Sequence, residues 1–317
     1  MKKVLSSILV LVIFSFFPQL SYAEKFRLKV GYLAVAGQLP LVVSNERDNS
    51  SFQKVNVVLK KYKSWTSLEA ALTVGAVDAG VMTAPIVFSM AEKGVPVKVI
   101  GMTHRGGSTF VIRGVDSIAD LRNRLIGVLD PDNTENLVLH EFFKKYNLRL
   151  GMDVRTIGIT FGLALYDIEH EKVDGLFLPE PVGQMILDKK VGNVLDEAKD
   201  LMKNRVSSLL LVRESVLNSS SAAVQEWVDS VEESCAFIEK DIKDTGGKQC
   251  SIIQEKYFGY DRDLFEHVLM NHQGSLSFDN LRPSYQELKV LLNTAEEIQL
   301  ITSSVDLKSL VDLRFKK

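Results

Sequence analysis

Three short segments of this chain recur at one constant offset of 96 residues, the separation of Gly31 from Gly127. Residues 30–33 match 126–129, residues 64–65 match 160–161, and residues 77–85 match 173–181. Each match is short, but the shared register predicts two similar lobes within one chain. Two lobes that face each other across a cleft form a site that can close on a ligand.

Residues 1–23 have the pattern of a secretory signal peptide. Lys2 and Lys3 precede an apolar run over residues 4–17, Pro18 follows it, and small residues lead up to Ala23. We predict cleavage after Ala23 and a periplasmic protein. A retained membrane anchor is the alternative, although the run is short for a spanning helix.

Predicted strands and helices alternate along the chain, which is typical of an α/β protein whose parallel sheets are covered on both faces. After Glu214 the sequence becomes mainly helical, and we expect this tail to pack on the first lobe. The first lobe then comprises residues 24–106 and 208–317, the second comprises residues 107–207, and two strands cross the hinge. The predicted strands cover residues 26–33, 55–59, 77–82, 97–102, 109–112, 125–129, 154–159, 175–178 and 208–212.

The composition excludes several classes of function. A formal net charge of −2 without basic stripes argues against nucleic acid and other polyanions as partners. The five histidines have no metal-ligand spacing, and neither a glycine-rich phosphate loop nor a nucleophile elbow is present. We therefore predict no cofactor, no metal site and no catalytic residue. No pattern indicates an oligomer, so we expect a monomer.

Two cysteines, Cys235 and Cys250, lie on either side of the helix-breaking residues 245–247. In a helical hairpin the two could meet, and an oxidising compartment would allow a disulfide. Two buried thiols are the alternative. We predict the disulfide.

Candidate ligand-binding residues follow from one rule: in open parallel sheets, ligands bind beyond the carboxyl ends of the strands, where helix N-termini supply free N–H donors. Applied to both lobes and the hinge, the rule selects fifteen positions by their place after a predicted strand. They are Tyr32, Gln38, Ser64, Trp65, Thr83 and Ala84 in the first lobe, His104, Arg105 and Ser108 at the hinge, and Asp130, Asn133, Thr134, Thr160, Phe161 and Glu180 in the second lobe.

The expected roles of these residues differ. Three aromatic side chains could enclose a ligand or stack on it: Tyr32, Trp65 and Phe161. Alternatively, Trp65 and Phe161 could only cover the edge of the sheet. Thr134 could cap its own helix or offer a hydroxyl to an anion. Arg105 is the one arginine of the predicted cleft and could bind an anion or form a hinge salt bridge. Glu180 could accept a hydrogen bond from a ligand amine or ring N–H, or it could be a solvated residue between two prolines.

Residues 29–43, 63–108 and 173–181 together resemble the substrate-binding proteins of ABC importers in the nitrate/sulfonate/taurine and thiamine-precursor-like group. The resemblance covers residues 26–212 and lies mainly in the Ala-Pro rim at Ala84, in Trp65, and in the Glu-Pro rim at Glu180. It implies a two-lobed periplasmic binding fold of type II, with two hinge strands, that closes on a small solute and delivers it to a permease and an ATPase. Few basic residues lie in the predicted cleft, which favours an organic solute over nitrate or bicarbonate.

We therefore predict an extracytoplasmic solute-binding protein of an ABC importer. A periplasmic sensor subunit is the first alternative. An enzyme of the thiamine-pyrimidine or menaquinone-precursor type on the same fold is the second, and the signal peptide argues against it.

Overall fold

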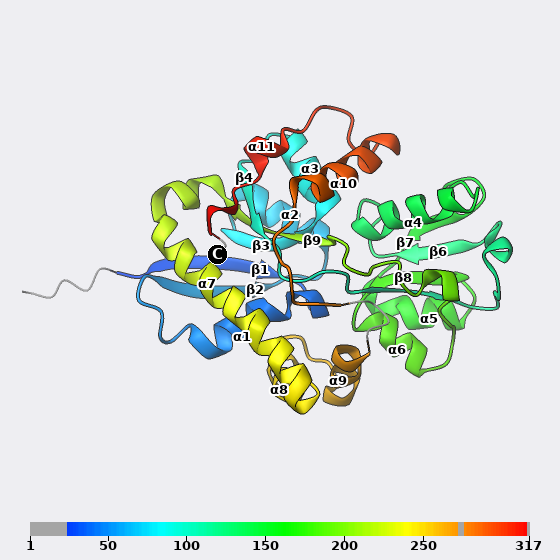
Figure 1. The fold of residues 1–317 in the computed structure, drawn as a ribbon, viewed down its shortest axis with the longest axis horizontal. Coiled ribbons are helices and arrows are strands. Elements are labelled where there is room, and N and C mark those ends of the chain that lie inside the picture. Colours follow the sequence, from blue (N-terminus) through cyan, green and yellow to red (C-terminus); the bar gives the residue numbers. More distant parts are fainter. Residues whose placement is uncertain (1–23, 272–275, 316–317) are drawn as a thin grey trace, which may run out of the picture.

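The computed structural model describes residues 24–271 and 276–315. The predicted signal peptide, residues 1–23, lies outside the described residues. Two α/β lobes stand side by side, each built on its own sheet (Figure 1). Within the described ranges we find no helix with the length and apolar composition needed to span a membrane.

The first lobe is built on a five-stranded sheet in the order β2-β1-β3-β9-β4. Strand β1 runs parallel to β2 and β3, whereas β9 runs antiparallel to both β3 and β4. The strands are β1 (Phe26–Tyr32), β2 (Val55–Lys61), β3 (Ala79–Thr83), β4 (Val97–Gly101) and β9 (Ser208–Arg213). Helices α1 (Leu39–Asp48), α2 (Trp65–Val74) and α3 (Ala84–Glu92) complete its strand–helix alternation.

The second lobe is built on a four-stranded sheet in the order β5-β8-β6-β7. Strand β6 is parallel to β7 and β8, and β5 is antiparallel to β8. The strands are β5 (Ser108–Ile112), β6 (Leu125–Val128), β7 (Arg155–Gly158) and β8 (Gly175–Pro179). Its helices are α4 (Thr134–Lys145), α5 (Ala164–Glu169) and α6 (Val182–Asp188).

The internal sequence repeat coincides with equivalent strands of the two sheets. Strands β3 and β8 occupy equivalent bounds at the offset of the sequence repeat, and each lies beside the equivalent strand β1 or β6. The aspartates that precede them have the same role. The Asp78 carboxylate accepts from Lys29 N at 2.9 Å, and the Asp174 carboxylate accepts from Leu125 N at 2.8 Å. Both aspartates thus lock neighbouring strands together at the sheet end away from the cleft.

Both sheets are mainly parallel, as predicted, and each also contains one antiparallel strand. The antiparallel strands β5 and β9 are those where the chain passes between the lobes. The parallel strands end at the cleft, so a strand that enters a lobe from the cleft must run in the opposite direction. The predicted lobe boundaries at residues 107 and 207 remain predictions.

Each sheet is covered by apolar side chains on both faces. In the first lobe one face packs Val30 and Val81 against Trp227 of α7, and the other packs Leu68 and Phe88. Smaller clusters cover both faces of the second sheet. Short 3-10 helices complete the connections: η1 (Ala36–Gln38), η2 (Ile118–Leu121), η3 (Phe161–Leu163), η4 (Asp196–Ala198) and η6 (Leu313–Phe315).

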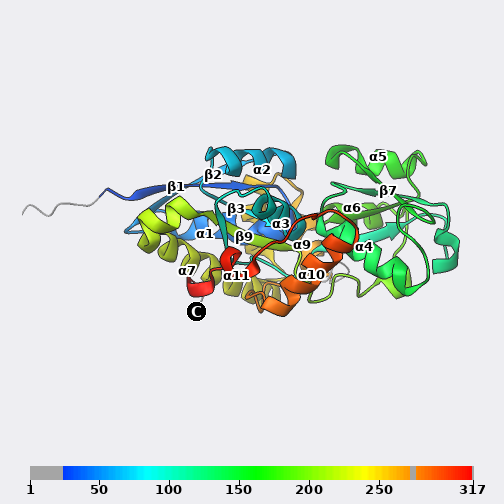
Figure 2. The same cartoon turned by 90° about the horizontal axis from the view of Figure 1, so that it is seen from above.

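The C-terminal part is helical, as predicted, but it contacts both lobes. Helix α10 packs against α3 of the first lobe and α4 of the second, and α9 packs against α6 (Figures 1 and 2). The expectation that the tail packs on the first lobe was therefore incomplete. The helices are α7 (Glu214–Thr245), α8 (Lys248–Tyr257), α9 (Arg262–Met270), α10 (Tyr285–Glu297) and α11 (Leu307–Leu310).

The predicted disulfide does not form in this structure, although α7 and α8 do make the expected hairpin around Gly246 and Gly247. Both thiols are buried, but they have different partners. Cys235 Sγ donates to Thr103 O at 3.7 Å, and Cys250 lies against the Asp241 carboxylate. Burial, followed by the charge and hydrogen bond of Asp241, raises the pKa of the Cys250 thiol strongly. Such a thiol resists the deprotonation that disulfide formation requires.

Candidate functional site

A small enclosed cavity lies between the lobes, beyond the carboxyl ends of the parallel strands. First-lobe Trp65 and Thr83, second-lobe Ser108 and Glu135, and His104 of the crossing segment contribute to its wall. Its free volume is about 10 Å³, enough for one water molecule. The lobes are therefore closed over this space. A backbone hydrogen bond across the cleft, from Ala36 N to Glu180 O at 2.8 Å, fits that closure.

Three of the side chains in this wall carry a buried polar atom that has no hydrogen-bond partner among the described residues. They are Trp65 Nε1, Thr83 Oγ1 and Glu135 Oε2. Buried polar groups in native proteins are usually paired, because an unpaired one costs about 1–3 kcal/mol. Three such atoms belong to side chains that line one cavity, and both lobes contribute them.

Local structure explains how these residues reach the cavity. Trp65 is the first residue of α2, whose N-cap Ser64 forms a capping box with Ser67. Thr83 ends β3 and is the N-cap of α3, but its hydroxyl makes no capping bond. Glu135 lies in the first turn of α4, which Asn133 caps. Each residue thus sits where a strand end passes into a helix N-terminus.

The Glu135 carboxylate is 1 % exposed and only partly paired. Ser108 Oγ donates to its Oε1 at 2.6 Å. Burial raises the pKa of this carboxyl, and hydrogen bonds from Ser108 and from the backbone N–H of Glu135 itself act in the opposite direction. The second oxygen, Oε2, is buried and has no hydrogen-bond partner among the described residues.

His104 forms another part of the wall, packed between two glycines. A Cβ added to Gly37 would lie 2.3 Å from the imidazole ring, and one on Gly107 would lie 3.2 Å from it. Thr103 Oγ1 contacts His104 Nδ1 at 3.1 Å and donates to Gly37 O. Burial lowers the pKa of His104 to about 4, against a hydrogen bond with the Gly37 backbone. The ring is therefore a neutral group at pH 7.

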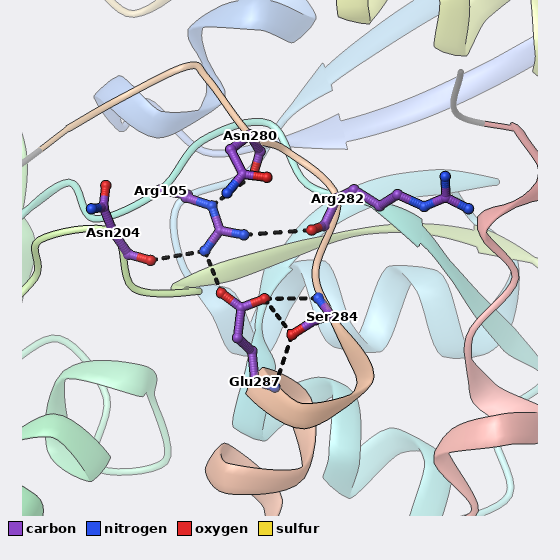
Figure 3. Close-up of polar contacts among 6 residues, drawn as sticks. All are labelled: Arg105, Asn204, Asn280, Arg282, Ser284 and Glu287. Atoms are coloured by element: carbon purple, nitrogen blue, oxygen red, sulfur yellow. Dashed lines mark hydrogen bonds and ion pairs between the residues drawn. The ribbon is translucent and has the colours of Figure 1, made fainter.

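Arg105 forms a hinge salt bridge, the second of its two predicted roles (Figure 3). Its Nη1 lies 2.7 Å from a carboxylate oxygen of Glu287 and 2.8 Å from Asn204 O. Its Nε donates to Asn280 O at 2.6 Å, and its Nη2 lies 3.5 Å from Arg282 O. The guanidinium thus ties both crossing segments to α10 and the loop that precedes it, and Arg105 is not among the residues that line the cavity.

Two other predicted residues, Thr160 and Phe161, line a separate and larger pocket at the mouth of the cleft. This mouth pocket has a volume of about 300 Å³ and includes Lys61, Lys63 and Tyr260 on the opposite side. Phe161 also packs against apolar clusters of both lobes. The predicted site therefore divides into an inner cavity and an outer mouth.

Several predicted ligand-binding residues instead stabilise the first lobe. Tyr32 donates to Tyr257 O at 3.3 Å and packs near Phe258. Gln38 accepts from Leu33 N and donates to Val81 O. Ser64 is exposed and caps α2, and Ala84 N donates to Ser207 O at 3.2 Å. These side chains are not brought to the cavity.

In the second lobe, three polar residues at the start of α4 also have structural partners. Asp130 accepts from Asp132 N, and Asn133 Oδ1 accepts from Asn136 N as the helix cap. Thr134 is fully buried, and its hydroxyl donates to Ser207 O at 2.6 Å, which joins α4 to the returning crossing segment. Thr134 therefore neither caps its helix nor offers its hydroxyl to the cavity.

Glu180 lies at the lobe interface, but its carboxylate points into the second lobe. Its Oε1 accepts from Thr109 Oγ1 at 2.5 Å, and its Oε2 accepts from Gln184 N at 2.9 Å. Burial raises the pKa of Glu180 to about 7, in spite of these two hydrogen bonds. A carboxylate with both oxygens engaged at the start of α6 is poorly placed to accept from a ligand.

The inner cavity is also lined by residues that the sequence did not single out, among them Gly37, Glu135 and Ser207. Glu135 directly follows Thr134 at a predicted helix start, so its position was available, but only the structure shows it turned inward. In the described part of the chain, no group of three His, Cys, Asp or Glu side chains could hold a metal ion.

Sequence comparison places this chain beside transport proteins. A sequence model of the NMT1-like family matches residues 21–253. The bicarbonate transport ATP-binding protein CmpC of Synechococcus elongatus is 23% identical over 237 residues, which cover 68% of this chain and 36% of CmpC. The chain thus spans about a third of the length of the curated relatives it matches.

Solved structures share the whole fold. The ligand-binding component of an ABC-type import system from Staphylococcus aureus, with zinc bound, has a TM-score of 0.79 at 18% identity and covers 92% of this chain and 98% of its own. The nitrate-binding protein NrtA of Synechocystis has a TM-score of 0.79 at 13% identity, with 92% and 87% covered. The alkanesulfonate-binding protein SsuA of Xanthomonas axonopodis pv. citri, bound to MOPS, has a TM-score of 0.76 at 17% identity, with 92% and 99% covered. These likenesses confirm the predicted periplasmic-binding-protein fold.

Proposed function

The chain belongs to the NMT1-like family, and from this premise we propose that it is an extracytoplasmic solute-binding protein of an ABC importer. It binds a small solute between the lobes, in a space that widens from the inner cavity when the lobes part, and delivers it to a permease and an ATPase. It acts without catalysis, after removal of residues 1–23.

The observation that carries the proposal is that Trp65, Thr83 and Glu135 line one cavity between the lobes and that each has a buried polar atom without a hydrogen-bond partner among the described residues. The first two come from one lobe and the third from the other. A solute that bonds to all three bridges the lobes, so it binds the closed state more tightly than an open one. That difference in affinity shifts the population toward closure.

The choice of solute is narrowed by the charges around the cavity. Among the described residues that line it, none is Lys or Arg, and Arg105 is already paired with Glu287. Nitrate and sulfonate are named for proteins of the same fold. This cavity favours an uncharged organic solute instead, because it offers no cation to balance an anion.

A thermal-shift screen of residues 24–317 tests the proposal. The panel contains inorganic anions, sulfonates, pyrimidines, flavins and amino acids, because a ligand that binds only the folded state raises the melting temperature. We expect one chemical class to raise it in the wild type and in a Tyr166→Ala control, which changes an exposed aromatic. Trp65→Ala should lose the shift. A hit that Trp65→Ala retains would contradict the site, and a folded protein that binds nothing on the panel, with no solute released on denaturation, would contradict the function.

A further inference from the structure

We propose that the inner cavity selects solutes with an amide-type edge, in which an N–H donor lies beside a hydrogen-bond acceptor, and that Glu135 is the residue that excludes oxyanions. The inference rests on the proposed function and narrows its ligand class.

The position at which an anion would bind in the second lobe is occupied by the protein itself. A helix N-terminus with a nearby hydroxyl is a favourable anion site. At the start of α4, however, Ser108 Oγ donates to Glu135 Oε1 at 2.6 Å, and the backbone N–H of Glu135 bonds to the same carboxylate. The donors that would hold a solute oxyanion are thus bound to the side chain of Glu135.

The remaining oxygen of the Glu135 carboxylate determines which charge on a solute the cavity tolerates. Glu135 lines the cavity, its Oε2 is buried without a hydrogen-bond partner, and no Lys or Arg lies among the described lining residues. Two like charges in contact repel each other strongly in a partly buried site, because the effective dielectric constant there is far below that of water. An oxyanion beside Oε2 of the ionised carboxylate would therefore be disfavoured, whereas an N–H group would satisfy this acceptor.

The first lobe supplies the two other unpaired polar groups, those of Trp65 and Thr83, which can bond to the opposite side of the solute. Trp65 Nε1 can only donate a hydrogen bond, so the solute must offer it an acceptor. Thr83 Oγ1 can donate or accept and so suits either edge of the solute. A planar group with N–H on one side and C=O on the other can bond to Glu135 and Trp65 together. Such a group would join the two lobes, whereas a carboxylate would satisfy only the tryptophan.

Acetamide and acetate form a matched pair of probes for this idea, since they have the same shape and differ in one atom and in charge. The chain has two tryptophans, Trp65 and Trp227. The indole N–H signal of Trp65 in a ¹⁵N–¹H spectrum therefore reports directly on the cavity, and that of Trp227 in the first-lobe core serves as an internal control. A Trp65→Phe variant assigns the signals.

We expect acetamide to shift the Trp65 signal saturably and to bind the wild type at least about tenfold more tightly than acetate, as expected for a hydrogen bond to a charged group. In Glu135→Gln the amide oxygen takes over the bonds from Ser108 and the backbone, so an N–H faces the cavity. This variant should reverse the preference toward acetate. Glu169→Gln, which removes an exposed carboxylate of α5, should behave as the wild type.

Two results would overturn the inference: acetate binding the wild type as tightly as acetamide, or acetamide leaving the Trp65 signal unchanged. A Glu135→Gln variant whose acetamide-to-acetate ratio stays within twofold of the wild type would overturn it as well. These failures are distinct from failure of the proposed function. A sulfonate that closes the lobes in the screen would preserve the solute-binding role while refuting the amide-type selection.

Discussion

Glu180→Gln is expected to stabilise the folded protein at neutral and alkaline pH, because it removes a buried ionisation. The carboxylate is 3 % exposed, and its pKa is raised from 4.5 to about 7 by burial. A group whose pKa is raised in the folded state contributes stability below its unfolded pKa and loses it as the pH rises through the folded value. The wild type should therefore lose stability between pH 4.5 and pH 7 through this group.

The size of the effect follows from the shift of the pKa. Each unit is worth 1.36 kcal/mol, so ionising Glu180 costs the folded state about 3 kcal/mol above pH 7. A glutamine can retain both hydrogen bonds, with its oxygen accepting from Gln184 N and its NH₂ donating to Thr109 Oγ1. Asp188 and His267 act on the Glu180 carboxyl with opposite signs and remain unchanged in the variant.

Urea unfolding of both proteins from pH 5 to pH 8 measures the difference directly. Taking the variant minus the wild type at each pH cancels His104, whose lowered pKa gives a pH dependence of the opposite sign. The difference should grow in favour of Glu180→Gln by about 2–3 kcal/mol across this range. A difference that stays constant with pH, or that favours the wild type at pH 8, would refute the reasoning.

Three further substitutions test individual contacts. Arg105→Lys should lower the free energy of unfolding by about 2–4 kcal/mol in urea titrations, because a single ammonium cannot bond to the Glu287 carboxylate and three carbonyls together. A change below about 0.5 kcal/mol would mean that the Arg105 hydrogen bonds contribute little to the stability of the fold. Gly37→Ala should cost about 1–3 kcal/mol and weaken solute binding, since its Cβ would meet the His104 ring; wild-type stability and affinity would show that the ring moves freely. Thr83→Val should leave the solute-free protein as stable as the wild type or slightly more so, and weaken solute binding in calorimetry; a large loss of stability without solute would mean that the hydroxyl is paired.

Much of the architecture could be predicted because its signals are local. Residues 77–85 and 173–181 carry the same order of aspartate, apolar strand and proline, and they fold into equivalent strands β3 and β8. All nine predicted strands are present, with bounds that differ by a few residues. Alternation of apolar residues and turn residues is sufficient for this, since each strand and helix is recognised within its own segment.

Contacts between segments that are distant in the sequence were harder to predict. The antiparallel direction of β5 and β9 depends on how the chain re-enters each lobe, and the position of α10 across both lobes depends on tertiary packing. Cys235 and Cys250 flank a hairpin as predicted, yet their thiols face Thr103 and Asp241. Sequence spacing placed these residues near the right turn without giving the direction of their side chains.

The residues of the candidate site could also be predicted only in part. The strand-end rule brought Trp65, Thr83, His104 and Ser108 to the inner cavity. It could not tell that the carboxylate of Glu180 turns into its own lobe, or that Glu135 turns toward the cavity, because both are acids at a helix start. Which way each acid points is decided by its hydrogen-bond partners, Thr109 and Ser108, which lie far away in the sequence.

If a solute closes the two lobes over the inner cavity, its binding must shorten a distance across the cleft. Lys63 and Gly162 line opposite sides of the mouth pocket, and a side chain at Gly162 would meet no atom within 4 Å. Spin labels at Lys63→Cys and Gly162→Cys avoid the native cysteines, which are buried. Pulsed electron paramagnetic resonance should show a longer, broader distance in the solute-free protein and a shorter, narrower one with the solute identified by the thermal screen. A distribution unchanged by saturating solute would contradict the account.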